Sequence, residues 1–149
     1  MNAQVVDASE ALNRATASLQ QGDTAAALAE LASIPPEQRP PLACATFAFQ
    51  LAQLAGEYKI ATRLCHEAIK KDPKNSELYL HLGQILLLAG KKKDAMWIFR
   101  MGLRHGKHPQ IITQQKQLGS RKSPPLPFLP RDNPLNKYLG ILLNRLRLR

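Results

Sequence analysis

Metal binding is the first chemistry to consider, because the chain contains four histidines. His105 and His108 could meet on one side of a turn, with His81 as a distant third ligand. Gly106 and Pro109 instead favour a bend between two helices, where we expect both imidazoles to be solvated. The sequence therefore predicts no metal site.

The acidic and cysteine residues form no catalytic pattern. No two of the eleven acids are paired in a setting that would separate their proton affinities, and no glycine-rich phosphate loop follows a strand. Cys44 and Cys65 occupy core-like helical positions without paired spacing, so we expect two buried, reduced thiols. We expect a protein that is not an enzyme and that has no cofactor and no small-molecule substrate.

Positive charge is concentrated in the second part of the chain. Residues 1–56 contain two basic and five acidic side chains, whereas residues 57–149 contain nineteen and six, and the total is +10. This asymmetry indicates an anionic neighbour or a tail kept soluble by its charge. Lys91, Lys92 and Lys93 oppose the dipole of the helix that they begin, so they form either a solvated face or contacts with an acidic partner.

A period of 34 residues organises the middle of the chain. It relates Gly22 to Gly56 and Gly90, and a fixed period of this length is typical of a stacked repeat. The same step relates two apolar columns: Ala27, Ala61, Ala95 and Leu31, Cys65, Phe99. The expected helices are about 6–20, a segment from Asp23 or Thr24 to Ser33, one opened by Pro40 and Pro41, 57–71, 76–89, 92–104 and 109–118.

The best-preserved unit runs from Ser76 to His108. We expect Ser76 to cap its first helix and Gly90 to end it in the left-handed conformation. Asp94 helps to start the second helix, in which the small Ala95 lets the two helices approach closely. Each unit is therefore a helical hairpin.

These residues resemble the tetratricopeptide repeat family. The resemblance covers about residues 8–108 and rests on these pieces: Gly56-Glu57-Tyr58, Ala61, Ala68 and Asp72-Pro73, then Tyr79, Leu82-Gly83, Gly90, Ala95 and Phe99. It implies an all-α, right-handed helical-hairpin solenoid with a repeat domain over 1–119. Its units would be about 8–41, 42–75 and 76–109, followed by a partial fourth helix at 109–118. It also implies a non-enzymatic protein-interaction module or adaptor.

By register with that family, the concave face would bind a partner peptide or protein. The residues that this assigns to the groove are Thr46, Gln50, Gln53, Glu77, Leu80, Gln84 and Leu87. Family members that grip acidic chaperone C-termini have lysine and asparagine where this chain has Thr46, Gln50, Leu80 and Gln84. A groove of leucine and glutamine instead suits an extended or helical peptide with apolar anchors.

The C-terminal part has a different composition. We expect a proline-rich, extended linker at 120–132 and a basic amphipathic helix at 133–149. The apolar face of that helix consists of Leu135, Tyr138, Leu139, Leu142 and Leu146. This face would dock on the repeats, on a partner or on a membrane, which leaves a membrane-surface adaptor as the alternative function. Nucleic-acid binding is a weaker alternative, because the basic residues are not interleaved with aromatic ones.

We infer the cellular location from two sequence features that we expect to be absent, a signal peptide and a membrane-spanning helix. The N-terminus lacks the basic start and long apolar core of a signal peptide. No stretch approaches the roughly 20 apolar residues of a membrane-spanning helix. We therefore expect a cytoplasmic protein, peripheral at a membrane if the C-terminal helix binds lipid.

Overall fold

The computed structural model describes residues 7–119 and 134–145. These residues form α-helices and one 3₁₀ turn, with no strand among them. The elements are α1 (Ala8–Gln20), α2 (Thr24–Ser33), η1 (Pro36–Gln38), α3 (Pro41–Ala55), α4 (Tyr58–Lys71), α5 (Ser76–Leu88), α6 (Lys92–His105), α7 (Pro109–Leu118) and α8 (Pro134–Arg145). The predicted all-α fold is confirmed.

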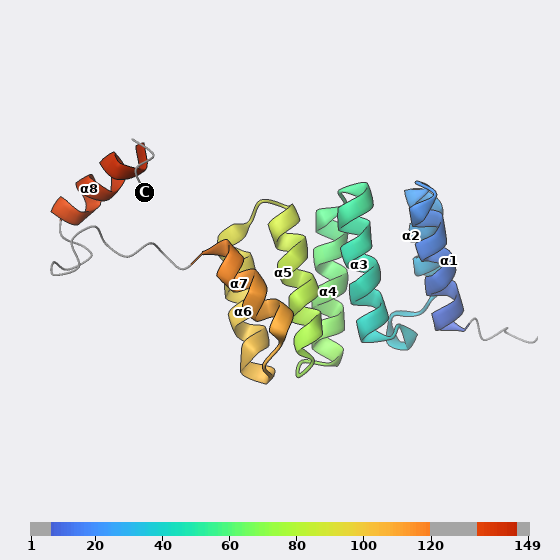
Figure 1. Ribbon diagram of the computed structural model, residues 1–149. Coiled ribbons are helices and arrows are strands. Elements are labelled where there is room, and N and C mark those ends of the chain that lie inside the picture. Colours follow the sequence, from blue (N-terminus) through green and yellow to red (C-terminus); the bar gives the residue numbers. More distant parts are fainter. Residues whose placement is uncertain (1–6, 120–133, 146–149) are drawn as a thin grey trace, which may run out of the picture. The chain divides into compact units, whose positions relative to one another are not determined.

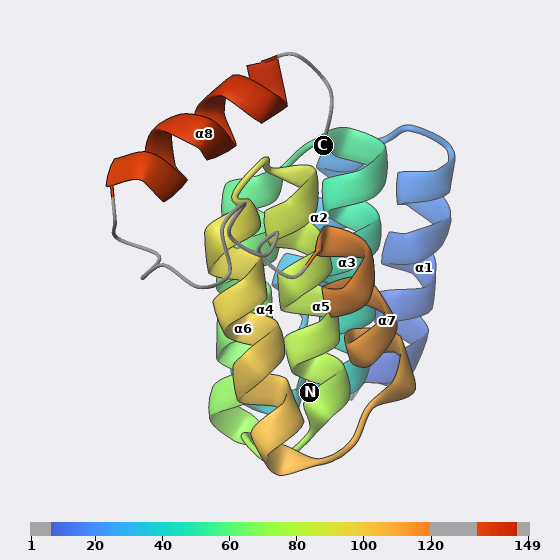
Figure 2. The ribbon, with the colours of Figure 1, turned by 60° about the vertical axis from the view of Figure 1, so that its left-hand side comes forward.

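The first six helices form three hairpins that stack side by side. Helices α1, α3 and α5 lie in one layer, and α2, α4 and α6 lie in the other (Figure 1). Within the first layer α1 packs against α3, and α3 packs against α5. Helix α7 follows the third hairpin and packs against α6, as Figure 2 shows from the side.

The 34-residue columns have the structural roles that the period predicts. Gly22, Gly56 and Gly90 each follow the first helix of a hairpin, and their φ angles are 85°, 70° and 75°. A positive φ is the conformation that glycine adopts at little cost and that side chains with a Cβ avoid. In the second helices, the column of Ala27, Ala61 and Ala95 is fully buried. The hairpin register is therefore confirmed.

One predicted cap is wrong by a single residue. The side chain of Asn75 accepts a hydrogen bond from the Glu77 amide at 3.1 Å, so Asn75 caps α5 and Ser76 is its first helical residue. Asp23 caps α2 in the same way, through the Ala26 amide at 2.9 Å. The correction has a simple reason, because Asn and Ser are equally good caps and adjacent in the sequence.

Glycines bring the last helices into close contact. A Cβ added to Gly102 of α6 would lie 2.8 Å from the Cβ of Tyr79 on α5 and 2.9 Å from Cδ1 of Ile111 on α7. Ile111 is fully buried, so α7 contributes a side chain to the core of the third hairpin. Gly102 thus lets three helices meet at one point.

The second helix of the first hairpin is shorter than its counterparts. Helix α2 has 10 residues, whereas α4 and α6 have 14 each. Pro35 and Pro36 stand where α4 continues with Ile69 and Lys70, and proline cannot continue a helix. The chain instead forms a connection over 34–40 that contains η1, and the first residue of this connection, Ile34, is buried.

The C-terminal segment forms a separate compact unit. The chain divides into Met1–Leu118 and Gly119–Arg149. Helix α8 belongs to the second unit, in which Tyr138 and Leu142 are exposed and Leu139 is half-buried. Leu135 is the second residue of α8, while Leu146 and the predicted linker over 120–132 lie outside the described residues. None of the described helices has the length and apolar content needed to cross a bilayer.

Candidate functional site

One stripe of α3 and one stripe of α5 carry the predicted groove residues. On α3, Thr46 and Gln50 are half-buried and Gln53 is exposed. On α5, Glu77, Gln84 and Leu87 are half-buried. We use the name inner stripe pair for four accessible positions at helical spacing on each of these two helices. They are Leu42, Thr46, Phe49 and Gln53 of α3, and Glu77, His81, Gln84 and Leu88 of α5.

Leu80 does not line an accessible surface. Its side chain is only 2% exposed and belongs to the same buried core as Ile111 of α7. The 34-residue step preserves burial at most positions, such as half-buried Gln50 and Gln84, but not at this one. The 34-residue step from Thr46 leads to Leu80, but the accessible position on α5 is His81. The assignment of Leu80 to the groove is therefore wrong.

His81 lies at the centre of the inner stripe pair. Its Nε2 is 3.5 Å from the Thr46 hydroxyl, and its ring centroid is 5.8 Å from that of Phe49 at an interplanar angle of 33°. The Thr46 hydroxyl also donates to the Leu42 carbonyl at 3.0 Å. These contacts tie α3 to α5 through one imidazole.

The surroundings of His81 favour its neutral form. Burial lowers the pKa of His81 below its ordinary value, and the charge of His108 acts in the same direction. Glu77 and Gln84 oppose that shift but do not overcome it. A neutral imidazole keeps one donor and one acceptor nitrogen, so it can bind either group of a partner backbone.

Three polar atoms in the described part of the chain are buried without a hydrogen-bond partner. They are Nδ1 of His81, Nδ1 of His108 and Nε2 of Gln115. Buried polar groups normally have partners, and an unpartnered one costs about 1–3 kcal/mol. His81 and His108 are also close enough to influence each other's charge. These three atoms therefore have hydrogen-bonding capacity that the fold does not use, although they are covered from solvent.

The two remaining histidine predictions need correction. His105 is the last residue of α6, and its ring stacks on Tyr79 with centroids 5.3 Å apart and an interplanar angle of 25°. His108 is half-buried just before α7. His105 is exposed as predicted, but it belongs to α6 and His108 is half-buried, so the two do not form a solvated pair in one loop.

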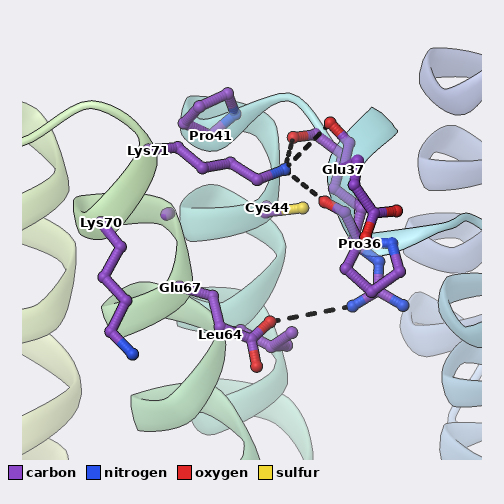
Figure 3. Close-up of a pocket in the computed structure, with 10 residues that line it drawn as sticks. Pro36, Glu37, Pro41, Cys44, Leu64, Glu67, Lys70 and Lys71 are labelled. Carbon is purple, nitrogen blue, oxygen red and sulfur yellow. Dashed lines mark hydrogen bonds and ion pairs between the residues drawn. The ribbon is translucent and has the colours of Figure 1, made fainter.

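A hollow lies where α2 lacks the last turn that α4 and α6 have. It encloses about 260 Å³ beside the connection between α2 and α3 (Figure 3). The Lys71 ammonium donates to the carbonyls of Pro36, Glu37 and Arg39, the last at 2.9 Å. Lys71 comes from the last turn of α4, so it fixes the connection to the next hairpin (Figure 3).

Arg39 holds the other side of that connection. Its guanidinium donates to the Ile34 carbonyl at 2.9 Å and to the Leu31 carbonyl at 3.1 Å. Both carbonyls lie at the end of α2, where the Leu31 carbonyl also accepts from the Ile34 amide at 3.2 Å. A third nitrogen lies 3.9 Å from a carboxylate oxygen of Glu67 on α4. Arg39 and Lys71 therefore bind backbone carbonyls at the end of α2 and along the connection that follows it.

The hollow has an apolar interior and no group prepared for catalysis. Pro41, Cys44, Leu64 and Ala68 line it. Burial raises the pKa of the Cys44 thiol, although Arg39 and Lys71 act against that shift. A thiol is nucleophilic only as the thiolate, so Cys44 at neutral pH behaves as a small apolar side chain. The hollow is therefore better suited to holding one apolar side chain of a partner than to catalysing a reaction.

The lysine run predicted as a partner contact is accessible. Lys91 is the residue before α6, Lys92 and Lys93 open that helix, and all three side chains are exposed. Their contact with an acidic partner stays a prediction.

The sequence reasoning missed the roles of His81 and Lys71. For His81 a signal was present, because Glu77, His81 and Gln84 share one face at helical spacing. For Lys71 no signal was available, since its acceptors are backbone carbonyls more than 30 residues earlier.

Comparison with known proteins agrees with this repeat architecture. Residues 52–112 match the family model described as tetratricopeptide repeat. The match runs from the last turn of α3 to the start of α7, so it includes α4, α5 and α6. No curated protein and no solved structure gave a match. Residues 52–112 are therefore similar to the tetratricopeptide repeat family.

Proposed function

We propose that this chain binds a segment of a partner protein on the inner stripe pair of α3 and α5. The family is in general a non-enzymatic protein-interaction fold, which supports the class of function. The family does not specify the binding surface. We choose it from the residues that remain accessible after the hairpins have stacked.

The observation that carries the proposal is the state of His81. The ring is half-buried between Phe49 and Thr46, yet its Nδ1 has no partner among the described residues. That nitrogen is itself covered, so a bound peptide would contact the accessible part of the ring and the polar side chains beside it. Gln53 and Gln84 offer further donors and acceptors on either helix.

The apolar part of the inner stripe pair would determine which side chains of the bound segment are preferred. Leu42 is 38% exposed and Leu88 is 44% exposed, and they belong to α3 and α5 respectively. A bound segment that places apolar side chains on these leucines and backbone groups on His81 would use both features. The expected ligand is therefore an uncharged, apolar-containing peptide, in line with the absence of lysine from the inner stripe pair.

Selection from a random peptide library with the full chain tests this function. We expect the selected peptides to shift the amide resonances of Thr46, His81 and Gln84 in nitrogen–proton correlation spectra. His81→Ala and Gln84→Lys should each weaken binding about tenfold or more, because each removes a buried polar contact. Ala29→Lys, on the exposed side of α2, is the matched control and should bind as the wild type does.

Two results would contradict the proposal. Peptides whose resonance shifts map to α4 and α6 would move the site to the other layer. Full binding by both inner-stripe variants would remove His81 and Gln84 from the site, provided that circular dichroism shows them folded.

A further inference from the structure

The outer surface of α4 and α6 carries a pattern that the 34-residue step repeats. Positions 59, 63, 66 and 70 of α4 correspond to positions 93, 97, 100 and 104 of α6. In each helix these four positions fall on one face, because they are spaced by four, three and four residues. All eight side chains are exposed: Lys59, Arg63, His66, Lys70, Lys93, Trp97, Arg100 and Arg104. We call this set the outer basic face.

On each helix this face lies opposite the core, and lysine or arginine occupies three of its four positions. On α6 the buried residues are Ala95, Ile98, Phe99 and Gly102, which lie on the other side of the helix from Trp97. The equivalent positions of α2 are Ala25, Ala29 and Ala32, which are exposed and uncharged. The charge is thus specific to the second and third hairpins. It is not a general property of exposed helical positions in this chain.

No acid interrupts either column. Glu67 of α4 points towards Arg39, with which it forms the ion pair in Figure 3. Asp94 of α6 lies about a quarter of a turn from the column. Each stripe extends for about 16 Å at 1.5 Å per residue, so several negative charges could bind along it at once.

Trp97 distinguishes this face from an ordinary solvated one. It is 59% exposed, and it is the only tryptophan in the chain. Half-buried Met96, Met101 and Leu103 lie on its two sides. Large aromatic side chains are normally placed where they bury apolar area, so an indole left in water among cations indicates a missing partner.

We propose that the outer basic face binds an anionic lipid surface, with Trp97 entering the headgroup region between the cations. An indole has an apolar ring and a polar N–H, which is why tryptophan is enriched at the membrane–water boundary. Lysine and arginine side chains near an anionic leaflet each contribute to attraction. A face for single-stranded nucleic acid would need several stacking aromatics, and this one has a single ring. The proposal uses the opposite layer from the peptide site and does not depend on it.

Lipid binding by the full chain can be followed at Trp97 itself. Vesicles of phosphatidylcholine with phosphatidylserine should shift the emission of Trp97 to shorter wavelength, and lipids brominated in their acyl chains should quench it. Vesicles of phosphatidylcholine alone should do neither. The double variant Arg63→Glu/Arg100→Glu should weaken vesicle binding at least about tenfold, since it reverses two charges of the face.

A matched control separates the face from net charge. Lys107→Glu/Lys116→Glu changes the total charge by the same amount at exposed positions before and within α7. It should bind vesicles within about twofold of the wild type, because only the non-specific attraction between its net charge and the vesicle is reduced. Circular dichroism should show both variants as helical as the wild type.

Three outcomes would overturn the proposal. Vesicle binding without any change in Trp97 emission would place the contact elsewhere, for example on α8. Equal loss in both double variants would show that only net charge matters. An oligouridylate that shifts Trp97 emission more strongly than the vesicles, with the same dependence on Arg63 and Arg100, would identify the partner as nucleic acid.

Discussion

Gly83 of α5 faces the ring of Phe99 on α6 with no room for a methyl group between them. A Cβ added to Gly83 would lie 2.6 Å from both Cδ1 and Cζ of Phe99. Phe99 is fully buried, so the ring has no space into which to move. This contact sets the distance between the two helices of the third hairpin.

Gly83→Ala should therefore destabilise the fold despite the higher helix propensity of alanine. Overpacking of this kind costs about 1–3 kcal/mol, which exceeds the roughly 1 kcal/mol that alanine gains within a helix. Urea unfolding followed by circular dichroism measures the difference. Gly106→Ala is the control, because a Cβ there meets no atom within 4 Å. Equal stability of Gly83→Ala and the wild type would contradict the close contact.

Lys71→Met should loosen the connection between the first two hairpins. The substitution keeps the apolar stem but removes the ammonium that donates to the carbonyls of Glu37 and Arg39. Because Lys71 remains partly accessible to water, we expect a modest loss of about 1 kcal/mol in the free energy of unfolding. Lys70→Met removes the same charge from the neighbouring residue. If the two variants melt at the same temperature, the Lys71 contacts do not contribute.

The folded state should lose stability in mild acid through His81. Burial lowers the pKa of His81 in the folded protein below the 6.5 of a free imidazole, so the unfolded chain binds the proton more readily. Its contribution is thus complete above pH 6.5 and is lost as the pH falls through the lower folded value. His81→Gln should flatten the dependence of the unfolding free energy on pH between about 7 and 5. An unfolding free energy with the same pH dependence in His81→Gln and in the wild type would contradict this prediction.

The sequence allowed the hairpins to be predicted, because their determinants are local. Gly56 and Ala61 act within one turn and one helix contact, and both recur at a fixed step. The burial of Leu80 next to an accessible His81 is not set locally. It depends on how α5 meets its neighbours, with Ile111 of α7 in the same core. The alignment of repeat positions does not reveal such contacts with other helices.

Truncation after Gly119 tests the role of the C-terminal segment. We expect its apolar face to pack on the repeats, since an isolated helix of this length is marginal in water. Burial of each large apolar side chain is worth about 1.5–3 kcal/mol, so the truncated chain should melt at a lower temperature and bind more of an apolar dye. An equally stable truncated chain that has lost lipid or partner binding would instead show that Tyr138 and its neighbours form an anchor.

The early end of α2 also makes the stack uneven in local stability. The third hairpin packs on the second through both α3 and α4, whereas the first packs on the second through α1 and has no comparable contact between α2 and α3. In a repeat stack, each neighbour interface adds its own term to the free energy of opening. The amide protons of α1 and α2 should therefore exchange with solvent through partial openings that leave α3 to α6 protected. The first hairpin can detach and close again while the inner stripe pair remains intact.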